Sequence, residues 1–184
     1  LVARLYDSEP YTRVYDRFGL LGPRTLLGHC IYLEDDELAL IKVRGAAVVH
    51  CPTANRFLDA GRLDLNRVIA AGIPVALGSD VGAGHTLSMP RVAQAMLQTA
   101  VDLGNRPPTA AYAWWLITRG NAHTLGWNDT GRIEHHAEAD LLEITPPAGW
   151  LEHPDPLSRL LWGWDDRWIT RTLVAGKPVF TASA

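Results

Sequence analysis

The chain has 184 residues, of which 47% are hydrophobic and 20% are charged, so it is long enough and apolar enough to bury a sizeable core. Its formal net charge of −3, with no run of basic residues, argues against a nucleic-acid-binding surface. No apolar stretch approaches the ~20 residues that a membrane-spanning helix needs, so we expect no membrane partner.

Residues 1–22 are expected to be helical, with a break at Pro10. Leu5, Val14 and Leu21 fall on broadly helical spacing. The stretch lacks the charged, apolar and small-residue regions of a signal peptide. It begins without Met, on what reads as the tail of a helix. We therefore expect the chain to be a fragment whose amino-terminal part is missing.

Strand, loop and helix then alternate three times at roughly thirty-residue spacing, which is typical of consecutive βα units in a parallel sheet or barrel. The expected strands are 25–30, 46–49 and 74–77, and the expected helices are 34–45, 63–71 and 89–103. A polar residue that can bind metal stands at the carboxyl end of each strand: His29, His50 and Asp80. The carboxyl ends of adjacent parallel strands lie at one edge, so we expect these residues to lie near one another.

After a further expected helix at 110–126 the pattern becomes rich in strands. The expected elements there are a strand at 139–144, a helix at 157–162 and two strands within 170–180 that are joined by a glycine turn. The change predicts a boundary near residue 127. It divides a barrel portion, 1–126, from a β-rich segment with a flanking helix, 127–184.

The stretch from Gly72 to Gly84, GIPVALGSDVGAG, predicts a short buried strand that runs into a glycine-rich turn around Asp80. The glycines let the backbone bend sharply and approach a ligand closely. A carboxylate at the carboxyl end of a buried parallel strand stands where α/β barrels place their chemistry. The same aspartate is also suited to cap the helix that begins near Ser88. This stretch alone leaves both roles open.

His29 and Asp80 are the pair best suited to catalysis. Imidazole and carboxylate are both ligands that zinc accepts. The two side chains do not complete a tetrahedral site, so further ligands must come from outside this chain. A hydrogen-bonded structural histidine is the alternative for His29.

The repeated dipeptide His-Cys, at His29-Cys30 and His50-Cys51, suggests a zinc site with two histidines and two cysteines. We reject it, because successive strand residues point to opposite faces and cannot easily reach one ion. Two cysteines are too few for a disulfide framework and favour a reducing compartment, so we expect a cytoplasmic location. The roles of His50 and His85 are left open.

Four stretches, in this order, resemble the carboxyl-terminal part of the guanine deaminases, a family within the metal-dependent amidohydrolase superfamily. They are YTRVYDRFGLLGPRTLLGHCIYL, RGAAVVHCPTANRFLDAG, GIPVALGSDVGAGHTLSM and LLWGWDDRWITRTLVAGKPV. HCPTAN with GSDVGAG would fit several amidohydrolase deaminases and chlorohydrolases. VYDRFGLL, Ser88-Met89 and the GWDDRWI tail favour the guanine deaminases within that set.

The resemblance implies an α/β fold: a partial (β/α)8 barrel, TIM-like, in which TLLGHC, AAVVHC and VALGSD are strands six, seven and eight. The β-rich segment would belong to a small β-sandwich. Asp80 would bind zinc, shuttle a proton and contact the substrate, and His29 would lie beside the reacting water. The metal histidines of strand one, the strand-five histidine and glutamate and the main purine-binding residues of the family are absent from this chain.

The implied activity is the zinc-dependent hydrolytic deamination of guanine to xanthine and ammonia in purine catabolism, by a protein that is a homodimer when full length. The alternatives are an amidohydrolase that acts on a different purine or a triazine, and a catalytically inert fragment. One departure from the family pattern, GRIEHHAEADLLEI, lies at an expected surface turn. We expect this chain alone to be inactive, and to associate through the open strand edges of a partial barrel.

Overall fold

The computed structural model describes residues 2–6 and 8–183. The elements of the first 102 residues are α1 (Val2–Leu5), α2 (Tyr11–Arg17), β1 (Leu26–Gly28), α3 (Asp35–Arg44), β2 (Ala47–His50), α4 (Pro52–Phe57), α5 (Leu65–Ala70), β3 (Val75–Leu77) and α6 (Met89–Asp102). Those that follow are α7 (Ala110–Trp115), η1 (Leu116–Gly120), α8 (Asn121–Thr124), β4 (Leu141–Ile144), α9 (Pro156–Trp162), η2 (Asp166–Trp168), β5 (Ile169–Val174) and β6 (Lys177–Thr181). The α/β class predicted from the sequence is confirmed.

The first sheet is parallel and has the strand order β1-β2-β3. Leu27 pairs with Val48, and Val49 pairs with Ala76. Each connection contains a helix, so the expected succession of βα units is confirmed. All three residues of β3 are buried, as expected for a strand covered on both faces.

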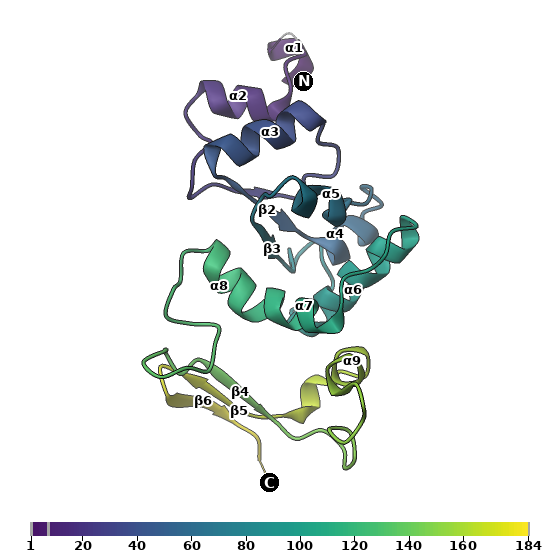
Figure 1. Ribbon diagram of the computed structural model, residues 1–184, viewed down its shortest axis with the longest axis vertical. Helices are drawn as coiled ribbons and strands as arrows, with labels where there is room; N and C mark the ends of the chain where they lie inside the picture. Colours follow the sequence, from purple (N-terminus) through teal and green to yellow (C-terminus); the bar gives the residue numbers. More distant parts are fainter. Residues whose placement is uncertain (1, 7, 184) are drawn as a thin grey trace.

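Helices α3, α5 and α6 supply most of the apolar residues that cover this sheet. The cluster of buried side chains includes Ile41 from α3, Val68 from α5 and Met96 from α6, packed with Val48 and Leu77 of the strands. Figure 1 shows these helices close to β2 and β3 in the middle of the molecule. The core therefore holds the strands whose carboxyl ends carry the candidate site residues.

The ends of α3 follow from its sequence. Its first turn is acidic, which suits the positive end of the helix dipole, and the Glu34 backbone N–H donates to Glu37 Oε2 at 3.0 Å. Gly45 ends the helix with a φ of 72°, the left-handed conformation expected for a glycine cap. At the amino terminus, Pro10 interrupts the helical run as predicted, and residues 1 and 7 of that run lie outside the described part of the chain.

The helix expected at 110–126 is a helical run with a π-helical turn, η1, between α7 and α8. Its last part covers the outer edge of β3. Asn121 accepts a hydrogen bond from the Leu77 N–H at 2.8 Å and donates to the Leu77 carbonyl at 3.0 Å, and the Thr124 hydroxyl donates to the Val75 carbonyl at 3.0 Å. The outer edge of β3 is therefore partly covered, because side chains of α8 bond backbone groups of Val75 and Leu77.

The second sheet is antiparallel, has the order β4-β5-β6 and lies at the opposite end of the molecule from α1 and α2 (Figure 1). Ala175 and Gly176 form the turn between β5 and β6, both with positive φ, as a tight hairpin turn requires. Helix α9 joins this part to the helices above, since Gln94 of α6 donates to the Leu161 carbonyl at 2.5 Å. Trp164 packs edge-on against Trp114 at 5.6 Å between ring centroids.

Two short helices, α4 and η2, are missing from the sequence-based expectation. Each is preceded by an N-cap residue with non-helical dihedrals, Cys51 before α4 and Asp165 before η2. Pro52 at the first position of α4 is the signal that was available, because proline is favoured there.

Candidate active site

The structure brings His29 and Asp80 together at the carboxyl edge of the parallel sheet. His29 directly follows β1 and Asp80 follows β3, and β2 lies between these strands. His29 Nε2 lies 3.7 Å from Asp80 Oδ2, with side-chain exposures of 46% and 37%. The expected proximity is confirmed, whereas the catalytic and metal-binding roles of the two residues stay predictions.

The backbone at both residues is in the left-handed region that favours glycine. The φ angles are 66° at His29, 52° at Cys30 and 47° at Asp80. Such conformations cost on the order of 1–3 kcal/mol each and gather at functional sites, where the surrounding structure imposes them. Here the Gly84 N–H donates to the Asp80 carbonyl at 2.6 Å, and the His29 N–H donates to the Val49 carbonyl at 2.9 Å.

Gly84 is required by the turn that follows Asp80. A Cβ at this position would lie 2.1 Å from the Ser79 carbonyl oxygen. Val81 and Gly84 also form an isolated parallel bridge, which closes the turn. The glycine-rich stretch therefore has the close backbone approach that its sequence predicts.

Asp80 does not cap helix α6. The residue before the first turn of α6 is Ser88, with extended dihedrals, and α6 begins at Met89. Asp80 instead faces His29 from the turn that follows β3. The helix-cap interpretation is therefore wrong, and the interpretation as a strand-end carboxylate remains.

Asn55 of α4 holds the His29 ring. The Asn55 Oδ1 atom lies 2.8 Å from His29 Nδ1, and the Asn55 side chain is buried. With the carboxamide oxygen facing the ring, Nδ1 donates the hydrogen bond and Nε2 lies on the side of Asp80. Sequence reasoning missed Asn55, although it stands in the HCPTAN motif. Its role depends on α4, the helix that was not predicted.

His50 lies in the core and not beside His29 and Asp80 as a third ligand. His50 is the last residue of β2 and is 1% exposed. Because side chains point alternately to the two faces of a strand, His50 lies on the same face as Val48, in the core. Burial, together with the nearby His29, lowers the pKa of His50 to about 4. Within the part of the chain that the structure describes, neither ring nitrogen has a hydrogen-bond partner. His50 is therefore a neutral buried residue near pH 7.

The two thiols are protonated near neutral pH. Burial raises the pKa of Cys30 to about 12, helped by Glu37 and Cys51, and burial also raises the pKa of Cys51. The rejection of a zinc site with two histidines and two cysteines stays a prediction.

A metal ion at this edge needs more donors than the chain brings together. Within residues 2–6 and 8–183, no group of three or more His, Cys, Asp or Glu side chains is placed to hold a metal ion. His29 and Asp80 offer one imidazole and one carboxylate, which are donors that zinc accepts. The donor chemistry fits zinc, and the number of donors does not complete its four-coordinate shell.

Residues 6–179 match the sequence profile of the Amidohydrolase family. The chain belongs to the amidohydrolase family. Among curated amidohydrolases it is 31% identical over 191 residues to the guanine deaminase of Escherichia coli K12, covering 97% of the chain and 43% of that protein. It is 32% identical over 204 residues to the guanine deaminase of Mus musculus, covering 100% of the chain and 44% of that protein. The chain thus spans less than half the length of these relatives.

Solved structures of amidohydrolases share this fold. The structure of Escherichia coli guanine deaminase has a TM-score of 0.90 and 30% identity, and the match covers 99% of the chain and 45% of that structure. A guanine deaminase from C. acetobutylicum with bound guanine has a TM-score of 0.87 and 32% identity, over 97% and 45%. An adenosine deaminase from Xanthomonas campestris with bound zinc has a TM-score of 0.86 and 30% identity, over 98% and 42%.

These matches confirm the resemblance to the guanine deaminases and the amidohydrolase fold, in a metal-dependent family. Among the described residues of this amidohydrolase chain, no helix has the length and apolar character needed to cross a membrane.

Proposed function

We propose that this chain is the carboxyl-terminal part of a zinc-dependent guanine deaminase, which hydrolyses guanine to xanthine and ammonia in purine catabolism. The observation that carries the proposal is the approach of His29 Nε2 to Asp80 Oδ2 at 3.7 Å, at the carboxyl edge of parallel strands. It is supported by the likeness to guanine deaminases over nearly the whole chain.

In this proposal β1, β2 and β3 are strands six, seven and eight of a (β/α)8 barrel. Residues 1–126 form the carboxyl-terminal part of the barrel, and residues 127–184 add a β-rich segment to a small sandwich. The parallel order β1-β2-β3 and the separate antiparallel sheet support this division. The match covers 45% of each of the two guanine deaminase structures, as expected of a chain that holds part of a barrel.

Asp80 and His29 take complementary roles. When bound, zinc supplies Lewis-acid chemistry that makes a nucleophilic water available near neutral pH. Asp80 binds the metal, contacts the purine and accepts on its carboxylate the proton that the attacking water loses. The departing amine takes up a proton to leave as ammonia, a step that Asp80 shares with a glutamate outside this chain. His29, with Nδ1 held by Asn55, presents the Nε2 lone pair to the water and keeps it oriented towards the purine carbon that carries the amine.

The remaining zinc ligands and purine contacts belong to the part of the protein outside this chain. The proposal therefore concerns the full-length protein, which we expect to be a cytoplasmic homodimer. The chain alone supplies one of the zinc ligands, Asp80, and is expected to be inactive.

The test is to purify the full-length protein, measure its zinc content and assay it with guanine, adenosine and a triazine. The proposal predicts bound zinc and a preference for guanine, with xanthine and ammonia released in equal amounts. Preference for adenosine would favour the second candidate, an adenosine deaminase, which the likeness to the Xanthomonas campestris structure supports. Protein without zinc and without activity on any of the three would identify an inert scaffold and contradict the proposal.

A further inference from the structure

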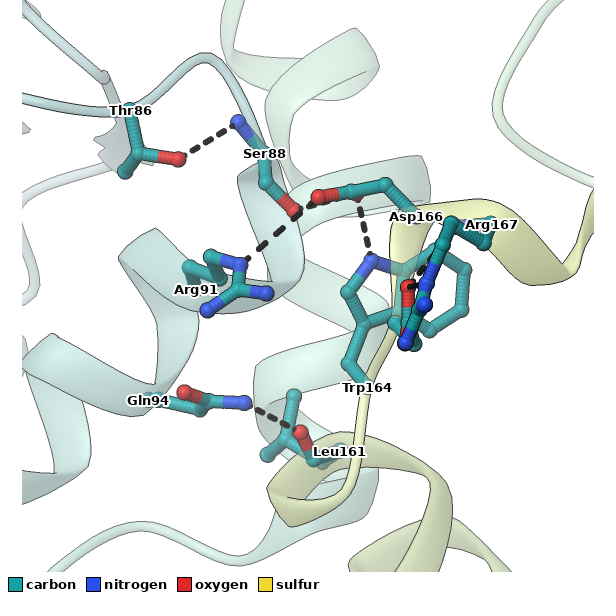
Figure 2. Close-up of polar contacts among 9 residues, drawn as sticks. Thr86, Ser88, Arg91, Gln94, Leu161, Trp164, Asp166 and Arg167 are labelled. Atoms are coloured by element: carbon teal, nitrogen blue, oxygen red, sulfur yellow. Dashed lines mark hydrogen bonds and ion pairs between the residues drawn. The ribbon is translucent and has the colours of Figure 1, made fainter.

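Two segments far apart in the chain meet beside the turn that carries Asp80. Figure 2 shows Ser88, the last residue of the loop 78–88 that carries Asp80, next to Asp166 of the segment before β5. The Ser88 hydroxyl donates to Asp166 Oδ1 at 2.7 Å, and Trp164 Nε1–H donates to the same oxygen at 2.7 Å. Arg91 Nε lies 3.6 Å from the other carboxylate oxygen, Oδ2. One carboxylate therefore joins the Asp80 turn, the first turn of α6 and the carboxyl-terminal segment.

The loop 78–88, from the end of β3 to the start of α6, is fixed at both ends. At its start the Gly78 N–H donates to the His50 carbonyl at 3.0 Å, and the Thr53 hydroxyl donates to the Ser79 carbonyl at 3.3 Å. Among the described residues, the side-chain hydrogen bond that ties positions 81–88 to a distant part of the chain is the one between Ser88 and Asp166. Val81 and Leu87, in between, are largely exposed and add little packing.

Asp166 itself is held in place. Trp164 is buried, and its ring lies 5.6 Å from the Trp114 ring and 6.1 Å from the Trp168 ring between centroids. The indole N–H that donates to Asp166 therefore belongs to a side chain that is fixed by packing. Burial disfavours the charged carboxylate, but the bonds from Trp164 and Ser88 and the charge of Arg91 outweigh it and hold the pKa of Asp166 below its ordinary value. The acceptor that Ser88 meets is thus ionised and preorganised.

We propose that Asp166 is a positioning residue for the loop 78–88, which keeps Asp80 opposite His29. Asp166 does not touch the reacting atoms: it fixes the carboxyl-terminal end of the loop through Ser88. Because Asp80 has a φ of 47°, its placement depends on the loop around it being constrained from both sides. The inference rests on the proposed function for its kinetic effect, but the anchoring itself is independent of the substrate.

The variants Asp166→Ala and Asp166→Asn in the full-length protein separate positioning from charge. Both hydrogen bonds end on Oδ1, which asparagine retains, while the partly exposed pair with Arg91 is weak. We expect Asp166→Ala to lower kcat ~10-fold or more with KM within about 3-fold, since a misplacement of ~1 Å can cost ~100-fold. Asp166→Asn should stay within about 3-fold of wild type in both constants.

Asp165→Ala is the matched control, because this neighbouring aspartate forms its side-chain bonds with Arg167 and none with Ser88. It should leave kcat unchanged. Ser88→Ala should act in the same direction as Asp166→Ala, and the double variant should be no slower than the worse single variant, as expected of one shared interaction. Ser88→Ala also serves as the test if Asp166→Ala fails to fold.

Backbone hydrogen exchange over residues 80–88 supplies a readout that needs no activity. The proposal predicts faster exchange there in Asp166→Ala and Ser88→Ala, and wild-type exchange in Asp165→Ala. Unchanged exchange, or an unchanged kcat for folded Asp166→Ala in an active enzyme, would overturn it. If the wild-type protein does not deaminate guanine and exchange still rises in Asp166→Ala, the anchoring stands and the proposed function fails.

Discussion

At the scale of single residues, the candidate site depends on three side chains from three different elements. His29 and Asp80 sit on strained backbone at the ends of β1 and β3, and Asn55 of α4 fixes the His29 ring from behind. Strain at two facing polar residues is typical of positions selected for function. The contact with Asn55 holds the His29 ring in the orientation that places Nε2, and not Nδ1, on the side of Asp80.

Replacing Asn55 tests which nitrogen carries the proton. Asn55→Asp can only accept from Nδ1, so it should keep the orientation of His29 and retain kcat within about 10-fold of wild type. Asn55→Leu, which can neither accept nor donate, should lose more activity. An Asn55→Asp enzyme as inactive as Asn55→Leu would show that Asn55 donates instead.

The buried His50 predicts a dependence of stability on pH. Its folded-state pKa of about 4 lies below its ordinary value of 6.5, so its contribution is full above pH 6.5 and is lost as the pH falls towards 4. The shift corresponds to about 3 kcal/mol at most.

His50→Leu should therefore unfold with a smaller loss of Tm between pH 7 and pH 5 than wild type. At pH 7 the change should be small, because the ring nitrogens that it removes make no hydrogen bonds. An equal loss of Tm in both proteins over this pH range would contradict the assignment.

At the scale of elements, side chains of α8 bond the outer edge of β3. Asn121 satisfies both backbone groups of Leu77, a few residues before Asp80. Asn121→Ala leaves a buried N–H and carbonyl unpaired, so we expect a loss of about 1–3 kcal/mol in the free energy of unfolding. Chemical denaturation of the full-length protein measures it. Exposed Asn128→Ala is the control, and a loss no greater than that of the control would contradict this role of α8.

The sequence was sufficient to predict the βα units, because each strand is a short apolar run that ends in a glycine or polar residue. It was also sufficient for Asp80, whose glycine-rich turn marks a strand-end carboxylate. It could not predict that Asn121 covers β3 or that Asn55 holds His29, because both contacts join elements whose relative placement is set by packing. The contact between Ser88 and Asp166 spans the two parts of the chain and has no local signal.

At the scale of the whole molecule, the two edges of the parallel sheet differ. The side chains of α8 occupy the outer edge of β3, whereas β1 has β2 as its one neighbour within the described residues. Exposed apolar side chains lie beside this edge, including Tyr11, Leu26 and Tyr32. Within the parallel sheet, the side of β1 is therefore the edge at which we expect association.

The isolated 184-residue chain should self-associate and should show no deaminase activity. Size-exclusion chromatography with light scattering, over a range of protein concentrations, measures the first property, and an assay with guanine in the presence of added zinc measures the second. Leu26→Lys places a charge at the open edge and should reduce association. A monomer at all concentrations would contradict the open edge, and turnover by the chain alone would contradict the need for donors outside it.

The most direct test of the account is the turnover of guanine by the full-length protein carrying Asp80→Asn. An amide keeps a weak oxygen ligand but cannot take the proton of the attacking water. The control is Asp59→Asn, since Asp59 is a second aspartate with a left-handed φ, 49°, on a loop away from the pair. We predict a loss of at least ~100-fold in kcat for Asp80→Asn, with zinc content reduced, and wild-type turnover for Asp59→Asn. An Asp80→Asn enzyme that kept more than about a tenth of wild-type turnover, a change of only ~1.4 kcal/mol in the barrier, would contradict the account.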